Sequence, residues 1–153
     1  MRLAGIAYLV YFALAGAGVG LKSTPLNIAG TAFYFVLFVL IYRFFAPVDP
    51  LVALAMLPIA ALACAVQGVG QLQSSSELQR VALVIFGVNL VLLGYLVARS
   101  GFAPSTLGYV LAVAGIGWCA AQIPGTPPVV MGIVFLFGAI SEGVFAFWLL
   151  FGS

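Results

Sequence analysis

The sequence predicts an all-α integral membrane bundle of six transmembrane helices with short loops, and two observations support this fold class. Hydrophobic residues make up 65% of the 153 residues and charged residues only 5%, and the mean hydropathy is +1.31. A soluble domain carries roughly 25% charged residues, so this chain cannot form a water-facing surface. The second observation is a series of six apolar runs, each close to the about 20 residues that cross a bilayer as a helix. We therefore expect residues 1–153 to form a single transmembrane domain.

The first three helices are expected at about 3–21, 28–45 and 51–71. The first run has the composition of a signal peptide, and we interpret it as a first membrane helix. Proline at the first helical position is a start signal, and the pairs Thr24-Pro25 and Asp49-Pro50 precede the second and third runs. Asp49 fits an N-cap, and Pro58 is expected to kink the third helix.

The last three helices are expected at about 78–97, 106–123 and 129–151. The sequence Ser74-Ser75-Ser76-Glu77 fits a capping box at the start of the fourth helix, in which Ser and Glu satisfy free backbone groups. Pro104-Ser105 precedes the fifth helix, and the proline-rich turn at 124–128 precedes the sixth. These short connections leave no room for a soluble domain.

The basic residues indicate an orientation. Cytoplasmic loops carry an excess of Lys and Arg. A cytoplasmic N-terminus places Arg2, Arg43 and Arg99 inside, and it places Lys22 and Arg80 outside. We therefore expect both termini to be cytoplasmic.

Composition also limits the chemistry. The chain has no histidine, so we expect no His-ligated haem, chlorophyll or metal, and no cofactor can be assigned. Cys64 and Cys119 lie in apolar runs, where cysteine acts as a small hydrophobe. The net charge of +2 is small and scattered, which argues against nucleic acid as a partner. The sequence contains no phosphate-binding loop and no paired nucleophile and base.

Glu142 is the one acidic residue that helix capping does not explain. It lies in the middle of the last apolar run, where an ionisable group costs a few kcal/mol, roughly 2.5–3.5 for Asp, Lys or Arg. Its neighbours one turn away are mostly small: Gly138, Ala139, Phe145 and Ala146. Glu142 is therefore expected to point at another helix, and apolar surroundings favour its neutral form.

Asn89 of the fourth helix lies at the same depth, which predicts a hydrogen bond between Glu142 and Asn89. Other polar and aromatic side chains fall in the outer half of the bundle and are candidates to line a pocket above Glu142: Gln67, Gln71, Gln122, Trp118 and Tyr34. The alternative is that each glutamine lies near the membrane surface and the aromatic residues belong to interfacial belts. The candidates for a ligand or proton site are Glu142, Asn89, Gln67, Gln122 and Trp118.

Small residues at helix-packing spacing form a further pattern. Membrane helices approach closely through such residues. Gly16 and Gly20 form a GxxxG pair on the first helix, and Gly138, Ala139 and Ala146 lie on the last. They are expected to pack within the chain or, alternatively, to dock on another membrane protein subunit.

Two segments carry a resemblance to a known family. The stretch LLGYLVARSGFAPSTLGYVLAVAGIGW at 92–118 and the turn YRFFAPVDPLVALAM at 42–56 resemble domain-of-unknown-function family 4386 of bacterial membrane proteins, with Asp49 where that family usually has Asn. The start, RLAGIAYLV, and the last helix, with Gly138, Glu142 and Trp148, are also similar. The resemblance implies a six-helix protein of the bacterial cytoplasmic membrane and supplies no activity.

Three functions fit these observations. The first, which the sequence favours, is a non-catalytic accessory subunit that packs within a larger membrane assembly in the lipid bilayer, since the chain has short loops and many small-residue faces. The second is a small membrane carrier or ligand-binding bundle with a midplane site at Glu142 and Asn89. The third, which we favour least, is an intramembrane enzyme acting on a lipid or isoprenoid with Glu142 as general acid.

Overall fold

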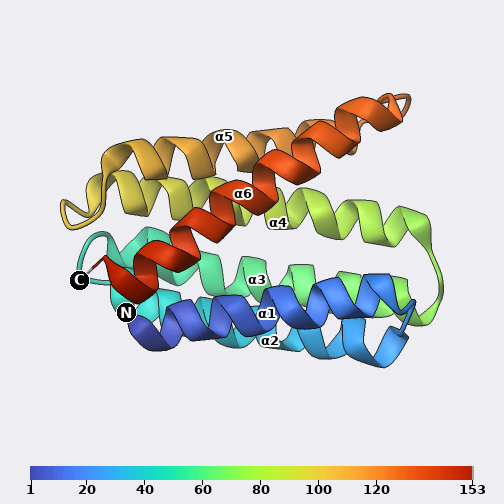
Figure 1. Ribbon diagram of the computed structural model, residues 1–153, viewed down its shortest axis with the longest axis horizontal. Coiled ribbons are helices and arrows are strands. Elements are labelled where there is room, and N and C mark those ends of the chain that lie inside the picture. The colour runs from blue at the N-terminus through green and yellow to red at the C-terminus, as the bar shows by residue number, and fades with distance from the viewer. Residues whose placement is uncertain (153) are drawn as a thin grey trace.

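The computed structural model describes residues 1–152, and all regular structure within them is α-helical (Figure 1). The helices are α1 (Arg2–Gly20), α2 (Thr24–Phe45), α3 (Pro50–Leu72), α4 (Ser76–Arg99), α5 (Ser105–Ala121) and α6 (Pro128–Phe151). This confirms the predicted all-α bundle of six helices.

Local capping chemistry sets where several helices begin. The Asp49 side chain accepts a hydrogen bond of 3.1 Å from the backbone N–H of Val52, as expected for an N-cap. In α4 the cap is Ser75, whose hydroxyl oxygen accepts from Leu78 N at 3.3 Å. Ser74 cannot fill this role because its φ of 53° lies in the left-handed region, outside the extended conformation of an N-cap.

The six helices form a closed ring. Each helix packs against its neighbours in the sequence, and α6 packs against both α5 and α1. Figure 1 shows the helices running along the long axis of the bundle in alternating directions. α6 crosses obliquely, and both termini lie at the same end. The ends of α1, α3 and α5 therefore lie at the opposite end of the bundle.

The outside of the ring is apolar. Five helices are long and apolar enough to cross a membrane by length and composition, and α5, at 17 residues, is a shorter apolar helix. Large hydrophobic side chains of α6 point outward, among them Leu136, Ile140 and Phe147, and all are more than half exposed. Lipid must cover such a surface, so the chain is a multi-pass membrane protein.

Glycine allows the closest helix approach in the bundle, between α4 and α5. A Cβ atom at Gly94 would lie 2.5 Å from the carbonyl oxygen of Gly108 and 2.6 Å from the backbone nitrogen of Ala112. Real Cβ atoms essentially never come this close to backbone. Only glycine therefore permits this contact.

The small residues predicted to pack divide into two groups. Gly138 and Ala146 are buried; Gly138 lies against the Trp118 ring, and the backbone of Ala146 faces Gly5 of α1. At Gly16 and Gly20 a Cβ atom would meet nothing within 4 Å, so these two glycines do not pack closely within the described chain. Docking on another subunit stays a prediction.

The packing glycine at this end of α1 is Gly18, which lies against Asn27 and occupies a different face of the helix. Ala139 is also exposed, and it lies outside the buried side of α6 that holds Gly138 and Glu142. Within residues 1–152, close packing of Gly16 and Gly20 against another helix is therefore not found.

Candidate functional site

Glu142 points into the bundle from α6, as its small neighbours predict. The side chain is only 9% exposed, and its Oε2 accepts a hydrogen bond of 2.9 Å from the hydroxyl of Tyr8 on α1. Tyr8 is fully buried and also packs edge-on against Phe145. The only acid in the apolar interior is thus held at the contact that closes the ring.

The predicted hydrogen bond between Glu142 and Asn89 is not formed. Asn89 is fully buried on α4, and neither of its side-chain polar atoms has a hydrogen-bond partner within residues 1–152. Similar depth in the membrane does not make two side chains neighbours. The principal neighbours of α6 are α1 and α5, which explains why Tyr8 takes the place expected for Asn89.

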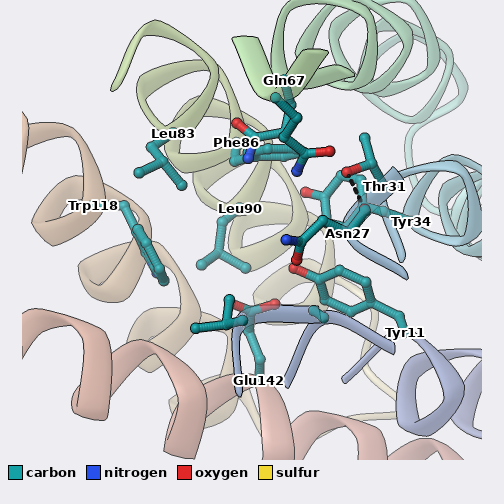
Figure 2. A pocket seen from close by; sticks show the side chains of 13 residues that line it. Tyr11, Asn27, Thr31, Tyr34, Gln67, Leu83, Phe86, Leu90, Trp118 and Glu142 are labelled. Carbon is teal, nitrogen blue, oxygen red and sulfur yellow. Dashed lines mark hydrogen bonds between the residues drawn. The ribbon is translucent and has the colours of Figure 1, made fainter. Parts of the chain in front are cut away.

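A cavity of about 150 Å³ lies inside the ring, and every helix contributes to its wall. We call it the Glu142 pocket. Figure 2 shows Glu142 at one end of it and Gln67 at the other. Its lining consists of Tyr11, Ala15, Val19, Asn27, Thr31, Tyr34, Gln67, Gln71, Leu83, Phe86, Leu90, Trp118 and Glu142.

Helical spacing gives the pocket two chemically different sides. Asn27, Thr31 and Tyr34 follow one face of α2 at intervals of four and three residues, and Gln67 and Gln71 do so on α3. With Tyr11 of α1 they form a polar side. The opposite side is apolar and consists of Leu83, Leu90 and Trp118 from α4 and α5 (Figure 2). Phe86 of α4 lies against Tyr34 and joins the two sides.

The pocket extends toward the end of the bundle that carries the α1–α2 and α3–α4 connections. A second cavity of about 300 Å³ shares four of its lining residues and reaches Thr24, Ser74 and Gln79 at the helix ends. Tyr11 lies about 14 Å along α1 from Gly20 at the entrance end of the bundle, since an α-helix rises 1.5 Å per residue. The two cavities together form a polar entrance that leads from one end of the bundle toward its middle.

The polar groups of the pocket differ in their hydrogen bonding. Within residues 1–152, the side-chain oxygens of Gln67 and Gln71 are buried and have no hydrogen-bond partner. The Thr31 hydroxyl donates to the carbonyl oxygen of Asn27 at 2.9 Å. Glu142 is the only Asp, Glu, Lys or Arg in the lining. In the same described part of the chain, no three His, Cys, Asp or Glu side chains gather to hold a metal ion.

The sequence-predicted site residues are partly brought together. Glu142, Gln67 and Trp118 line the pocket, as do Gln71 and Tyr34. Asn89 is not among the lining residues. Gln122 lies elsewhere, in a separate cavity of about 70 Å³ with Arg80 and the α5–α6 turn.

Four residues of the site with hydrogen-bonding side chains were not predicted: Tyr8, Tyr11, Asn27 and Thr31. For α2, the signal was present, because Asn27, Thr31 and Tyr34 share one face of an otherwise apolar helix. For Tyr8 and Tyr11 no comparable signal exists. Tyrosine is common in membrane helices near the interface, and only the ring closure brings these two to Glu142.

The fold and the pocket define the class: a multi-pass α-helical membrane protein with one buried carboxyl at the end of a central pocket that has a polar and an apolar side. The model of the family described as Domain of unknown function (DUF4386) matches residues 71–152, more than half of the chain. The chain belongs to this family. The matched part begins at the end of α3 and includes Trp118 and Glu142. In the comparisons with curated proteins and with solved structures, nothing matches the chain.

Proposed function

We propose that the chain is a small membrane carrier or ligand-binding bundle whose binding site is the Glu142 pocket. The observation that carries this proposal is that all six helices line one pocket with a single acidic side chain, Glu142, at its inner end. Ionisable residues within membrane helices mark substrate, ion or proton pathways by default, because their burial is costly.

A purely structural role for Glu142 explains fewer features of the site than a ligand-binding role does. The Tyr8 hydroxyl bonds to one oxygen of Glu142 and links α1 to α6. That bond does not explain why Gln67 and Gln71 keep unpartnered oxygens within the described chain, or why polar side chains follow α2 and α3 inward. Polar groups buried in a protein normally find partners. A ligand in the pocket would supply them.

For localisation, we propose the bacterial cytoplasmic membrane with both termini in the cytoplasm. Arg43 and Arg99 lie in the last turns of α2 and α4, at the end of the bundle that carries the termini. An excess of basic residues favours the cytoplasmic side. In this orientation the mouth of the pocket, near Thr24 and Ser74, faces away from the cytoplasm.

The pocket can be tested without knowing its ligand. In a chain whose Cys64 and Cys119 are replaced by serine, Ala15→Cys places a thiol in the pocket wall, and Ala7→Cys places one in the packed core of the same helix. A water-filled pocket lets a small charged thiosulfonate reagent reach the first thiol only. We expect modification of Ala15→Cys in intact cells, measured by mass spectrometry, and none of Ala7→Cys.

The side of modification reports the orientation separately. Reaction of Ala15→Cys only in inverted membrane vesicles would keep the pocket and reverse the proposed topology. An Ala15→Cys protein that is folded but unreactive from both sides would show that water does not enter the pocket. The proposed function would then be wrong.

A second candidate is an accessory subunit of a larger membrane assembly. The observation that favours it is that Gly16 and Gly20 lie exposed on α1 at a spacing that suits close helix contact. A partner helix in lipid would find backbone accessible there.

A further inference from the structure

The charge in the Glu142 pocket is not balanced by the protein. Among residues 1–152, no Lys or Arg lines the pocket, and Glu142 has only the neutral hydroxyl of Tyr8 as a hydrogen-bond donor. A charged group in such surroundings is stable only when it is paired. The carboxyl of Glu142 must therefore hold a proton or have a cation brought by a ligand.

The aromatic residues of the pocket suit a positive charge. Tyr11, Tyr34 and Phe86 form a continuous wall, with ring centroids 5.2 Å apart for Tyr11–Tyr34 and 4.6 Å for Tyr34–Phe86. Trp118 contributes a further ring on the opposite side. Aromatic faces attract cations within about 6 Å of the ring centroid, and tryptophan does so best.

Hydrogen-bonding groups point to the same ligand. The unpartnered atoms at the outer part of the pocket are the side-chain oxygens of Gln67 and Gln71, which accept hydrogen bonds. Anionic ligands find no positive charge in the lining. With Glu142 at its inner end, the pocket therefore discriminates against anions and favours cations.

The volume limits the size of the ligand. At the roughly 30 Å³ that one water occupies in the liquid, the cavity of about 150 Å³ holds about five waters, and the adjoining cavity of about 300 Å³ holds about ten. A ligand of about ten non-hydrogen atoms therefore fits when it extends into the adjoining cavity. The apolar side, with Leu83 and Leu90, accommodates a hydrocarbon body next to the charge.

We propose that the Glu142 pocket binds a small monovalent organic cation, an ammonium compound with an apolar body, and that this cation and a proton compete for Glu142. The inference rests on the proposed function, because it names the ligand class of the same pocket. In the loaded state the ammonium group pairs with the Glu142 carboxylate, and the aromatic wall and the apolar side enclose the rest of the molecule.

The other titratable groups near Glu142 do not offer a competing charge. They are Tyr8 and Tyr11 on α1 and Tyr34 on α2, and Cys64 of α3 lies near Tyr11 and Tyr34. All are of types that are ordinarily neutral at neutral pH. The residues that α4 and α5 contribute to the lining are uncharged. A change in cation binding at neutral or lower pH would therefore report Glu142.

The test uses benzyltrimethylammonium, whose charge does not change with pH. In the Trp148→Phe protein, purified in neutral detergent, Trp118 is the only tryptophan and lies in the pocket wall. We expect a saturable change of its fluorescence with benzyltrimethylammonium and none with benzenesulfonate, an anion of similar size. Lowering the pH should weaken cation binding, since the proton takes the same carboxylate.

Two glutamine substitutions provide the matched comparison. Glu142→Gln keeps the shape and can still accept from Tyr8, but it removes the charge and should weaken cation binding by about tenfold or more, because an attraction between charges is strong at low dielectric. Glu77→Gln removes an exposed carboxylate in the first turn of α4 and should leave binding unchanged. Circular dichroism and gel filtration verify that both variants are folded.

The outcomes separate the two proposals. Equal binding of the cation to wild type and Glu142→Gln, or no binding at all, would overturn the cation assignment. If Ala15→Cys is still modified from water, the pocket and the proposed function stand. If Ala15→Cys is also unreactive, both proposals fail.

Discussion

At Glu142 an acidic side chain lies in an apolar bundle and makes a single protein hydrogen bond. Its partner, Tyr8, is as buried as the core leucines. Hydrogen bonds between membrane helices contribute on the order of 0.6–2 kcal/mol. This bond should therefore be a measurable part of the stability of the α1–α6 contact.

The change Tyr8→Phe removes only the hydroxyl. We expect it to lower the free energy of unfolding by about 0.6–2 kcal/mol, measured by unfolding in mixed detergent micelles. Tyr109→Phe is the matched control, because Tyr109 lies on the outside of α5 and is 64% exposed. Equal stability of the two variants would show that the bond to Glu142 contributes nothing.

The sequence predicted the direction of Glu142 but not its partner. The small residues one turn away, Gly138 and Ala146, correctly indicated the buried side of α6. Only the equal depth of the two residues in the membrane predicted Asn89 as the partner of Glu142. Depth follows from counting residues along each apolar run, whereas the neighbour around the ring depends on which helices meet. That information is absent from the local pattern.

For the helices, the length of each apolar run predicted that a helix forms there, and the capping residues predicted where it begins. Asp49 caps α3 as expected, and the observed cap of α4 is one residue later than a Ser74–Glu77 box implies. α2 begins at Thr24 and not at Ile28, because Pro25 occupies the first turn and the polar residues that follow it are helical. Those polar residues include Asn27, which reaches the pocket.

The small-residue pattern predicted contact faces less well. GxxxG spacing occurs by chance in glycine-rich helices, and it becomes a contact only where the backbone of another helix is opposite. Gly94 meets Gly108 across α4 and α5, while Gly16 and Gly20 meet nothing within the described chain. The sequence alone does not tell these two outcomes apart.

These glycines provide a matched pair of substitutions. Gly94→Ala places a methyl group against the backbone of α5, and we expect a loss of roughly 1–3 kcal/mol in unfolding free energy, as for other overpacked sites. Gly16→Ala meets open space and should be neutral or slightly stabilising, since alanine favours a helix. Unfolding in mixed micelles measures both. A Gly94→Ala protein as stable as wild type would contradict the close packing of α4 and α5.

For the whole molecule, short connections made the up-and-down order predictable. The meeting of α1 with α6 was not predictable, because these helices are the most distant in sequence. The pocket depends on that contact, since it is enclosed by residues of all six helices. The sequence could therefore place a polar residue on one face of its helix. It could not identify the residues of other helices that this residue contacts.

The exposed glycines of α1 lead to a prediction about assembly. If the chain is an accessory subunit, extraction from native membranes in mild detergent should give a complex larger than the chain, detected on a native gel. Gly16→Leu together with Gly20→Leu should release the chain, because leucine holds a partner helix away. Gly132→Leu, at an exposed glycine of α6, is the control and should leave the complex intact. A wild-type chain that migrates alone would rule out the subunit role.

The Tyr8–Glu142 bond also bears on the order in which the protein is made. Its two residues are 134 positions apart, and synthesis proceeds from the N-terminus. When the first five helices have entered the membrane, the seam between α1 and α5 is still open, and Tyr11, Asn27 and Gln67 have no enclosed pocket to face. The binding site comes into existence only when the final helix inserts and brings the carboxyl with it. A prematurely terminated chain would thus be hydrophobic enough to enter the membrane and yet carry no site.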